Sequence, residues 1–184
     1  MLKLDPIWQS EIQQAHFRLL LDAMAHPGRC YSVTAQVKES PMALGILAIL
    51  LDAEVSLADP HGSLKNEDWY LLQAKSMSPE QADYILCDGT LVPEFEPKLG
   101  TLPSPEQSAT LVLVVNKIGQ GDINLKLKGP GIAETEELAI SGITSDWFSR
   151  REDWVCSFPL GVDFILVDDT QIVAIPRTTK VEII

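Results

Sequence analysis

The residues best suited to chemistry lie close to the C-terminus, where Arg177, Thr178, Thr179 and Lys180 follow one another. A guanidinium can bind two oxygens of one anion, and an ammonium adds a compact positive charge beside it. Two threonine hydroxyls supply further donors. The cluster therefore predicts a site for phosphate or phosphonate, placed just after a buried strand that ends at Ile175.

An internal ion pair is the alternative for the same arginine. Asp163 opens the preceding apolar run, and Glu182 follows the cluster. Either carboxylate could hold Arg177 and so fix the end of a strand. We therefore include Asp163 in the candidate anion site, as the group that decides whether the guanidinium is free.

A second candidate is the turn Gly129-Pro130-Gly131. Glycine lets backbone amides approach a ligand closely, so Gly129 and Gly131 are candidate ligand-loop residues. The spacing is neither that of a P-loop nor that of a dinucleotide fingerprint. A plain turn is the simpler interpretation.

No set of residues predicts catalysis. The chain has three histidines, His16, His26 and His61, and three cysteines, Cys30, Cys87 and Cys156. None of them stands at metal-ligand spacing, and there is no CxxC pair. We expect His16 in the core and the cysteines as small buried residues in a reducing compartment. The sequence also has no GxSxG, so we predict no catalytic residue, no metal and no cofactor.

Aromatic residues give the strongest non-catalytic pattern. A helix beginning at Ser145 or Asp146 would carry Trp147, Phe148, Arg151 and Trp154 on neighbouring faces. Buried aromatics are usually core, but tryptophan is also enriched at interfaces. Trp147 and Trp154 are therefore candidates for either role. The run Met42–Leu51 is apolar on every side, and it must be buried against a sheet or a partner.

Two uninterrupted apolar runs, Phe164–Val167 and Ile172–Ile175, predict buried strands joined by a turn at residues 168–170. Further strands are predicted at 31–33, 55–58, 84–87, 110–115 and 123–128, a hairpin loop at 117–122, and helices at 6–26, 42–51, around 69–72 and from 145. Strands and helices alternate, so we expect one α/β domain over residues 1–184, with a mixed sheet flanked by helices.

The composition of the chain limits the kinds of partner that it can bind. The net charge is −12, which argues against nucleic acid, because neutralising phosphates requires clustered lysine and arginine. The longest apolar run is about half a membrane span, and no signal-peptide pattern is present at the N-terminus. We expect a cytoplasmic protein with no membrane partner.

Three segments together resemble the PhnH family of the carbon–phosphorus (C–P) lyase complex. They are His16–Met24 with Pro27-Gly28, Leu127–Ile132, and the pairing of Pro159–Asp163 with Ile175–Ile183. The resemblance implies the fold of PLP-dependent transferases without PLP, and a homodimer when the protein is isolated. It also implies an accessory subunit of the complex that joins a phosphonate to the ribose of ATP, with other C–P lyase subunits as partners.

Two other functions stay open. The first is a free-standing enzyme or binder for a small phosphorylated ligand, such as a nucleotide or phosphonate, at Arg177 to Lys180. The second is a PLP enzyme reduced in size. Whether this chain carries any catalysis of its own is left undecided by the sequence.

Overall fold

The computed structural model describes residues 5–33 and 41–184. Its helices are α1 (Ser10–Ala25), α2 (Met42–Leu50), α3 (Asn66–Leu72) and α4 (Asp146–Val155), with short 3₁₀ turns η1 (Pro6–Trp8) and η2 (Pro105–Gln107). Its strands are β1 (Tyr31–Ser32), β2 (Ser56–Ala58), β3 (Lys75–Ser76), β4 (Tyr84–Asp88), β5 (Thr110–Val114), β6 (Lys117–Lys128), β7 (Glu136–Ser141), β8 (Asp163–Val167), β9 (Gln171–Ile175) and β10 (Lys180–Ile183).

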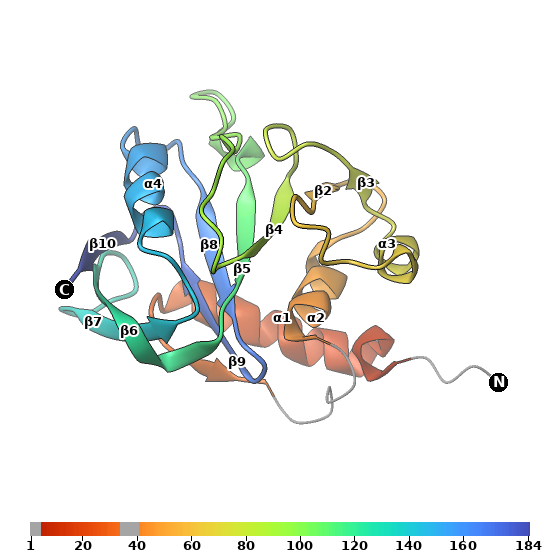
Figure 1. Ribbon diagram of the computed structural model, residues 1–184, viewed down its shortest axis with the longest axis horizontal. Helices are drawn as coiled ribbons and strands as arrows, with labels where there is room; N and C mark the ends of the chain where they lie inside the picture. Colours follow the sequence, from red (N-terminus) through yellow and green to blue (C-terminus); the bar gives the residue numbers. More distant parts are fainter. Residues whose placement is uncertain (1–4, 34–40) are drawn as a thin grey trace.

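The main sheet has seven strands in the order β1-β9-β8-β5-β4-β2-β3 (Figure 1). Strands β3, β2, β4, β5 and β8 run parallel, whereas β9 is antiparallel to β8 and β1 is antiparallel to β9. The predicted mixed sheet and the predicted pairing of the last two apolar runs are both confirmed.

Each face of this sheet is covered by a different layer. One face, which includes Leu86 and Ile165, packs under α1 and α2. The other face, which includes Ile85 and Leu111, packs under α4 and a three-stranded antiparallel sheet in the order β10-β6-β7. Successive residues of a strand point to opposite faces, so continuous apolar runs are what a sheet covered on both faces requires.

Helix α2 is buried against the main sheet, as its fully apolar sequence predicts. Its residues from Met42 to Leu47 are all buried, and they pack beside α1 on the sheet. His16 of α1 is also buried, and Gly45 of α2 lies so near that an added Cβ would sit 3.6 Å from His16 Nδ1. Burial lowers the pKa of His16 and so favours the neutral imidazole. The prediction of a core histidine is confirmed.

The predicted hairpin loop at Lys117–Asp122 is wrong. These residues begin the long strand β6, and its pairing with β7 shifts register between Ile118 and Ile123. A Cβ on Gly121 would lie 2.0 Å from the carbonyl carbon of Ile140, so this glycine permits a close approach of two strands within a bulge. Glycine is favoured both in hairpin turns and in β-bulges, so Gly119 and Gly121 alone do not distinguish a loop from a bulged strand.

Two of the three cysteines also differ from the prediction. Cys87 is buried in β4, whereas Cys30 and Cys156 are exposed, and all three are free thiols. Cys30 follows the turn after α1, and Cys156 follows the last residue of α4. Both positions lie outside the hydrophobic layers, which is why they are accessible.

Candidate functional site

Arg177 is held by Asp163. Because β8 and β9 are antiparallel, the start of β8 lies beside the end of β9. Arg177 Nη2 donates to Asp163 Oδ2 at 2.5 Å, Nε donates to Oδ1 at 3.3 Å, and the backbone N–H donates to the same Oδ1 at 2.7 Å. The side chains are 17% and 14% exposed. The guanidinium fork is therefore occupied by a carboxylate, as in the ion-pair alternative.

The rest of the predicted cluster divides into exposed and buried groups. Thr178 and Lys180 are exposed, whereas Thr179 is 1% exposed and its hydroxyl has no partner. Gly129 packs against this turn, since an added Cβ would lie 2.9 Å from Thr178 O. Gly131 packs elsewhere, where a Cβ would lie 2.3 Å from Ala25 O. The structure thus brings Gly129, but not Gly131, to the C-terminal cluster.

Both candidate interface tryptophans lie in the core. Trp147 is 0% and Trp154 is 3% exposed. Their indole N–H groups donate to Gly89 O at 3.1 Å and to Glu96 Oε2 at 2.7 Å. Both rings contact Phe164 edge-on, at centroid distances of 6.3 and 6.5 Å. Within the isolated chain, both rings therefore pack as the core alternative predicts.

Between these tryptophans, α4 buries a second arginine. Arg151 is 2% exposed, and its Nη2 donates to Pro176 O at 2.6 Å. Its Nε has no partner, and the guanidinium carbon lies 5.6 Å from the centre of the Phe164 ring. Burial lowers the pKa of Arg151 to about 10, opposed by the negative charge of Asp163. A guanidinium so far removed from solvent is costly unless something neutralises it.

A separate hollow lies at the carboxyl ends of the parallel strands, where α/β sheets commonly bind ligands. It has a volume of about 440 Å³. Its walls include Asp88 at the end of β4, Val114 at the end of β5 and Asp168 after β8, and Met42 at the start of α2. The lining includes four aspartates and one lysine, namely Asp68, Asp88, Asp168, Asp169 and Lys65. This acidic lining does not favour an anionic ligand.

Asp168, the most buried of these carboxylates, is fully used by the fold. Oδ2 accepts from Ile118 N at 2.9 Å, and Oδ1 accepts from Thr170 N and Gln171 N, both at 2.7 Å. Burial alone would raise the pKa of Asp168, but the hydrogen bonds outweigh it and hold the pKa below its usual range. Asp168 therefore fixes the β8–β9 turn onto β6 and is not free to act as a base.

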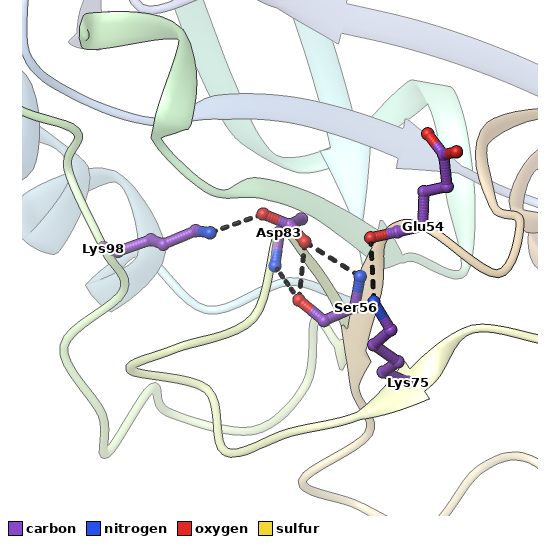
Figure 2. A network of polar contacts seen from close by, with 5 residues as sticks. All are labelled: Glu54, Ser56, Lys75, Asp83 and Lys98. Atoms are coloured by element: carbon purple, nitrogen blue, oxygen red, sulfur yellow. Dashed lines mark hydrogen bonds and ion pairs between the residues drawn. The ribbon is translucent and has the colours of Figure 1, made fainter.

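At the opposite, amino ends of the parallel strands, Ser56 and Asp83 form a reciprocal pair (Figure 2). Asp83 Oδ2 accepts from Ser56 N at 2.8 Å and from Ser56 Oγ at 2.6 Å, and Ser56 Oγ accepts from Asp83 N at 3.0 Å. Lys98 completes the network with an ion pair to Asp83 Oδ1. Every group has a partner within the network, so it ties β2 to β4 and offers no unused group for catalysis.

Over the whole described part of the chain, no group of three or more His, Cys, Asp or Glu residues could hold a metal ion. The described helices include none long and apolar enough to cross a membrane.

Comparison with known proteins assigns the family. Residues 7–182 match the family described as "Bacterial phosphonate metabolism protein (PhnH)". The chain belongs to the PhnH family. It is 41% identical over 177 residues to the "Putative C-P lyase subunit protein HtxG" of Stutzerimonas stutzeri, covering 96% of this chain and 89% of that protein. It is 29% identical over 189 residues to the "Alpha-D-ribose 1-methylphosphonate 5-triphosphate synthase subunit PhnH" of Rhizobium meliloti (strain 1021), covering 97% and 92%.

In this member of the PhnH family, the three segments that carried the resemblance meet in space. A Cβ on Gly129, in the second segment, would lie 2.9 Å from Thr178 O in the third. A Cβ on Gly28 would lie 2.6 Å from Leu127 Cδ1, and Gly131 abuts Ala25 at the end of α1. The segments therefore contact one another through glycines at close approaches.

Sequence reasoning missed the importance of Arg151 in this PhnH-family chain. The available signal was its spacing, because a charged residue stands on the same side of α4 as Trp147 and Trp154. A charge within an apolar helical stripe is a buried charge if the stripe faces the core.

Proposed function

We propose that this chain is an accessory subunit of the C–P lyase core complex in phosphonate catabolism, supporting the transfer of ribose triphosphate from ATP to an alkylphosphonate. The observation that carries the proposal is the 41% identity, over 96% of the chain, to a relative named as a C–P lyase subunit. A match of this length leaves little of the chain for a different function.

The geometry is compatible with an accessory role. Arg177 is bound to Asp163, and Asp168 is bound to three backbone amides. Thr178 and Lys180 of the candidate cluster are exposed, and Thr179 is buried. These residues support a subunit that contributes surfaces and stability to an assembly whose chemistry lies on other chains.

Finer expectations belong to the same proposal. The resemblance implies the fold of PLP-dependent transferases without the cofactor, a homodimer when the chain is isolated, and a cytoplasmic location. A free-standing binder of a small phosphorylated ligand is the alternative, and the occupied fork of Arg177 does not favour it at the position first predicted.

Co-expression of the affinity-tagged chain with the other subunits of its C–P lyase complex tests the proposal. We expect the tagged chain to copurify in one large species by native mass spectrometry, with its partners at fixed ratios. A chain recovered alone, as monomer or dimer, while the untagged partners assemble without it, would contradict the subunit role and favour the free-standing binder.

A further inference from the structure

We propose that the groove between α4 and β10 binds a small oxyanion, a phosphoryl or phosphonyl group, on the guanidinium of Arg151. The groove has a volume of about 380 Å³. Its walls are Phe148, Arg151, Glu152, Val155 and Cys156 from α4 and the residue following it, and Lys180 and Val181 from β10. This volume falls in the range of small-ligand pockets.

The guanidinium of Arg151 lacks a counter-charge. Within the described residues, no carboxylate lies within ion-pair distance of it. Asp163 is the carboxylate whose charge acts on it, and both oxygens of Asp163 already bind Arg177. Two arginines therefore share one carboxylate, and the region keeps an excess positive charge. A charge that is 2% exposed and unpaired is the kind that a bound anion stabilises.

Unused donors lie beside this charge. Arg151 Nε is buried without a partner, and so is Thr179 Oγ1. The two residues are neighbours, because Arg151 Nη2 and Thr179 N both donate to Pro176 O, at 2.6 and 2.9 Å. Buried donors without partners are rare in folded proteins. Arg151 lines the groove and Thr179 directly precedes the groove residue Lys180, so a ligand bound there would supply the acceptor that Arg151 Nε lacks.

The charge of the groove contrasts with that of the protein. The chain has a net charge of −12, yet the charged groove residues are two cations, Arg151 and Lys180, and one anion, Glu152. A planar guanidinium binds two oxygens of a phosphate or carboxylate. The choice of phosphorus over a carboxylate rests on the proposed function, whereas the presence of the anion site does not.

Ligand binding in the groove can be measured through the reactivity of Cys156. Its exposed thiol lines the groove, whereas the exposed thiol of Cys30 lines a different hollow and serves as an internal control. The experiment measures alkylation of the full chain by neutral iodoacetamide, with peptide mass spectrometry at each cysteine. Inorganic phosphate, methylphosphonate and acetate are compared at equal ionic strength. At ten times the Kd, mass action leaves about one molecule in eleven unliganded, so alkylation of Cys156 slows about tenfold.

Two neighbouring arginines provide matched variants. Arg151→Met replaces the guanidinium by an unbranched apolar side chain and so removes the cost of burying a charge, while Pro176 O keeps its hydrogen bond from Thr179 N, so this variant should fold. It should lose the slowing at Cys156. Arg150→Met should keep it, because Arg150 binds Glu96 and Phe95 O instead.

The proposal is overturned if neither phosphate nor methylphosphonate slows Cys156, if Cys30 slows equally, or if Arg151→Met is still protected. Equal protection by acetate at the same concentration would overturn the assignment to phosphorus. The wild-type comparison of Cys156 with Cys30 decides the matter even if Arg151→Met does not fold. Copurification with partner subunits is measured separately, so failure of the groove and failure of the subunit role are distinguishable.

Discussion

Removing the ion pair between Arg177 and Asp163 should destabilise the protein measurably. The perturbation is a double-mutant cycle of Arg177→Met, Asp163→Asn and the combined variant. The cycle isolates the side-chain contacts, because the Arg177 Nη1 bond to Pro105 O is lost in both variants that lack the arginine. The influence of Asp163 on Arg151 is likewise removed in both variants that lack the carboxylate, so it cancels to first order.

The size of the coupling free energy can be estimated from the contacts between the two side chains. The cycle removes one short bond of 2.5 Å and one long bond of 3.3 Å between side chains that are 17% and 14% exposed. Exposed pairs contribute about 0.2–1 kcal/mol, and breaking fully buried pairs costs about 3–5 kcal/mol. This pair lies between those limits, so we expect a coupling free energy of about 2 kcal/mol.

Urea unfolding at neutral pH supplies the measurement. With a slope of about 2 kcal/mol per molar, each single variant should lower the midpoint by about 1 M, and the double variant by less than the sum. A coupling below about 0.5 kcal/mol would refute the reasoning and place the pair among ordinary surface pairs. The same variants test the original anion site. If phosphate stabilises the wild type but not Arg177→Met, while stability without phosphate is unchanged, then Arg177 is a ligand and not a structural group.

Three further predictions concern other parts of the chain. The pKa of Asp168 is lower in the folded chain than in the unfolded chain. Its contribution to stability is therefore complete above the unfolded pKa of about 4 and is lost as the pH falls through the folded pKa. Asp168→Asn should cost about 2 kcal/mol of unfolding free energy at pH 7 and flatten the dependence of stability on pH below about pH 4. An unchanged acid limb in urea titrations would contradict this. Gly121→Ala should lower the melting temperature far more than Gly119→Ala. A Cβ on Gly121 meets the backbone of β7 at 2.0 Å, whereas a Cβ on Gly119 meets nothing within 4 Å and adds only the backbone strain of a φ of +86°. Equal melting temperatures would show that the close approach of β6 and β7 relaxes. Phe158 is 72% exposed, so Phe158→Ser should change the unfolding free energy by less than about 0.5 kcal/mol in urea titrations. A larger loss would show that the ring stabilises the loop before β8.

Much of the fold could be predicted from the sequence, because the local and global signals agree. The runs Phe164–Val167 and Ile172–Ile175 are apolar at every position, which a sheet covered on both faces demands, and they became β8 and β9. Strand β7 was missed because its residues, Glu136–Ser141, begin with two charges and bury only Leu138 and Ile140. Its place in the second sheet is set by pairing with β6, which is tertiary information.

The candidate site was harder to predict, because ion pairing depends on which residues the register of two strands places together. The sequence offers Asp163 and Glu182 as equal partners for Arg177. The antiparallel pairing of β8 with β9 decides for Asp163, since it places the start of one strand beside the end of the other.

The ion pair between Asp163 and Arg177 also determines which partners are left for Arg151. A carboxylate bound to two nitrogens of one arginine cannot serve a second arginine equally well. Within the described chain, the Arg151 guanidinium has a hydrogen bond to Pro176 O and the face of the Phe164 ring, but no ion pair. Satisfying Arg177 thus leaves Arg151 as the unneutralised charge. The anion site that the sequence predicts at Arg177 is therefore proposed at Arg151 instead. Arg151 is buried by α4, lies beside Thr179 and β10, and has no carboxylate among the described residues to neutralise it.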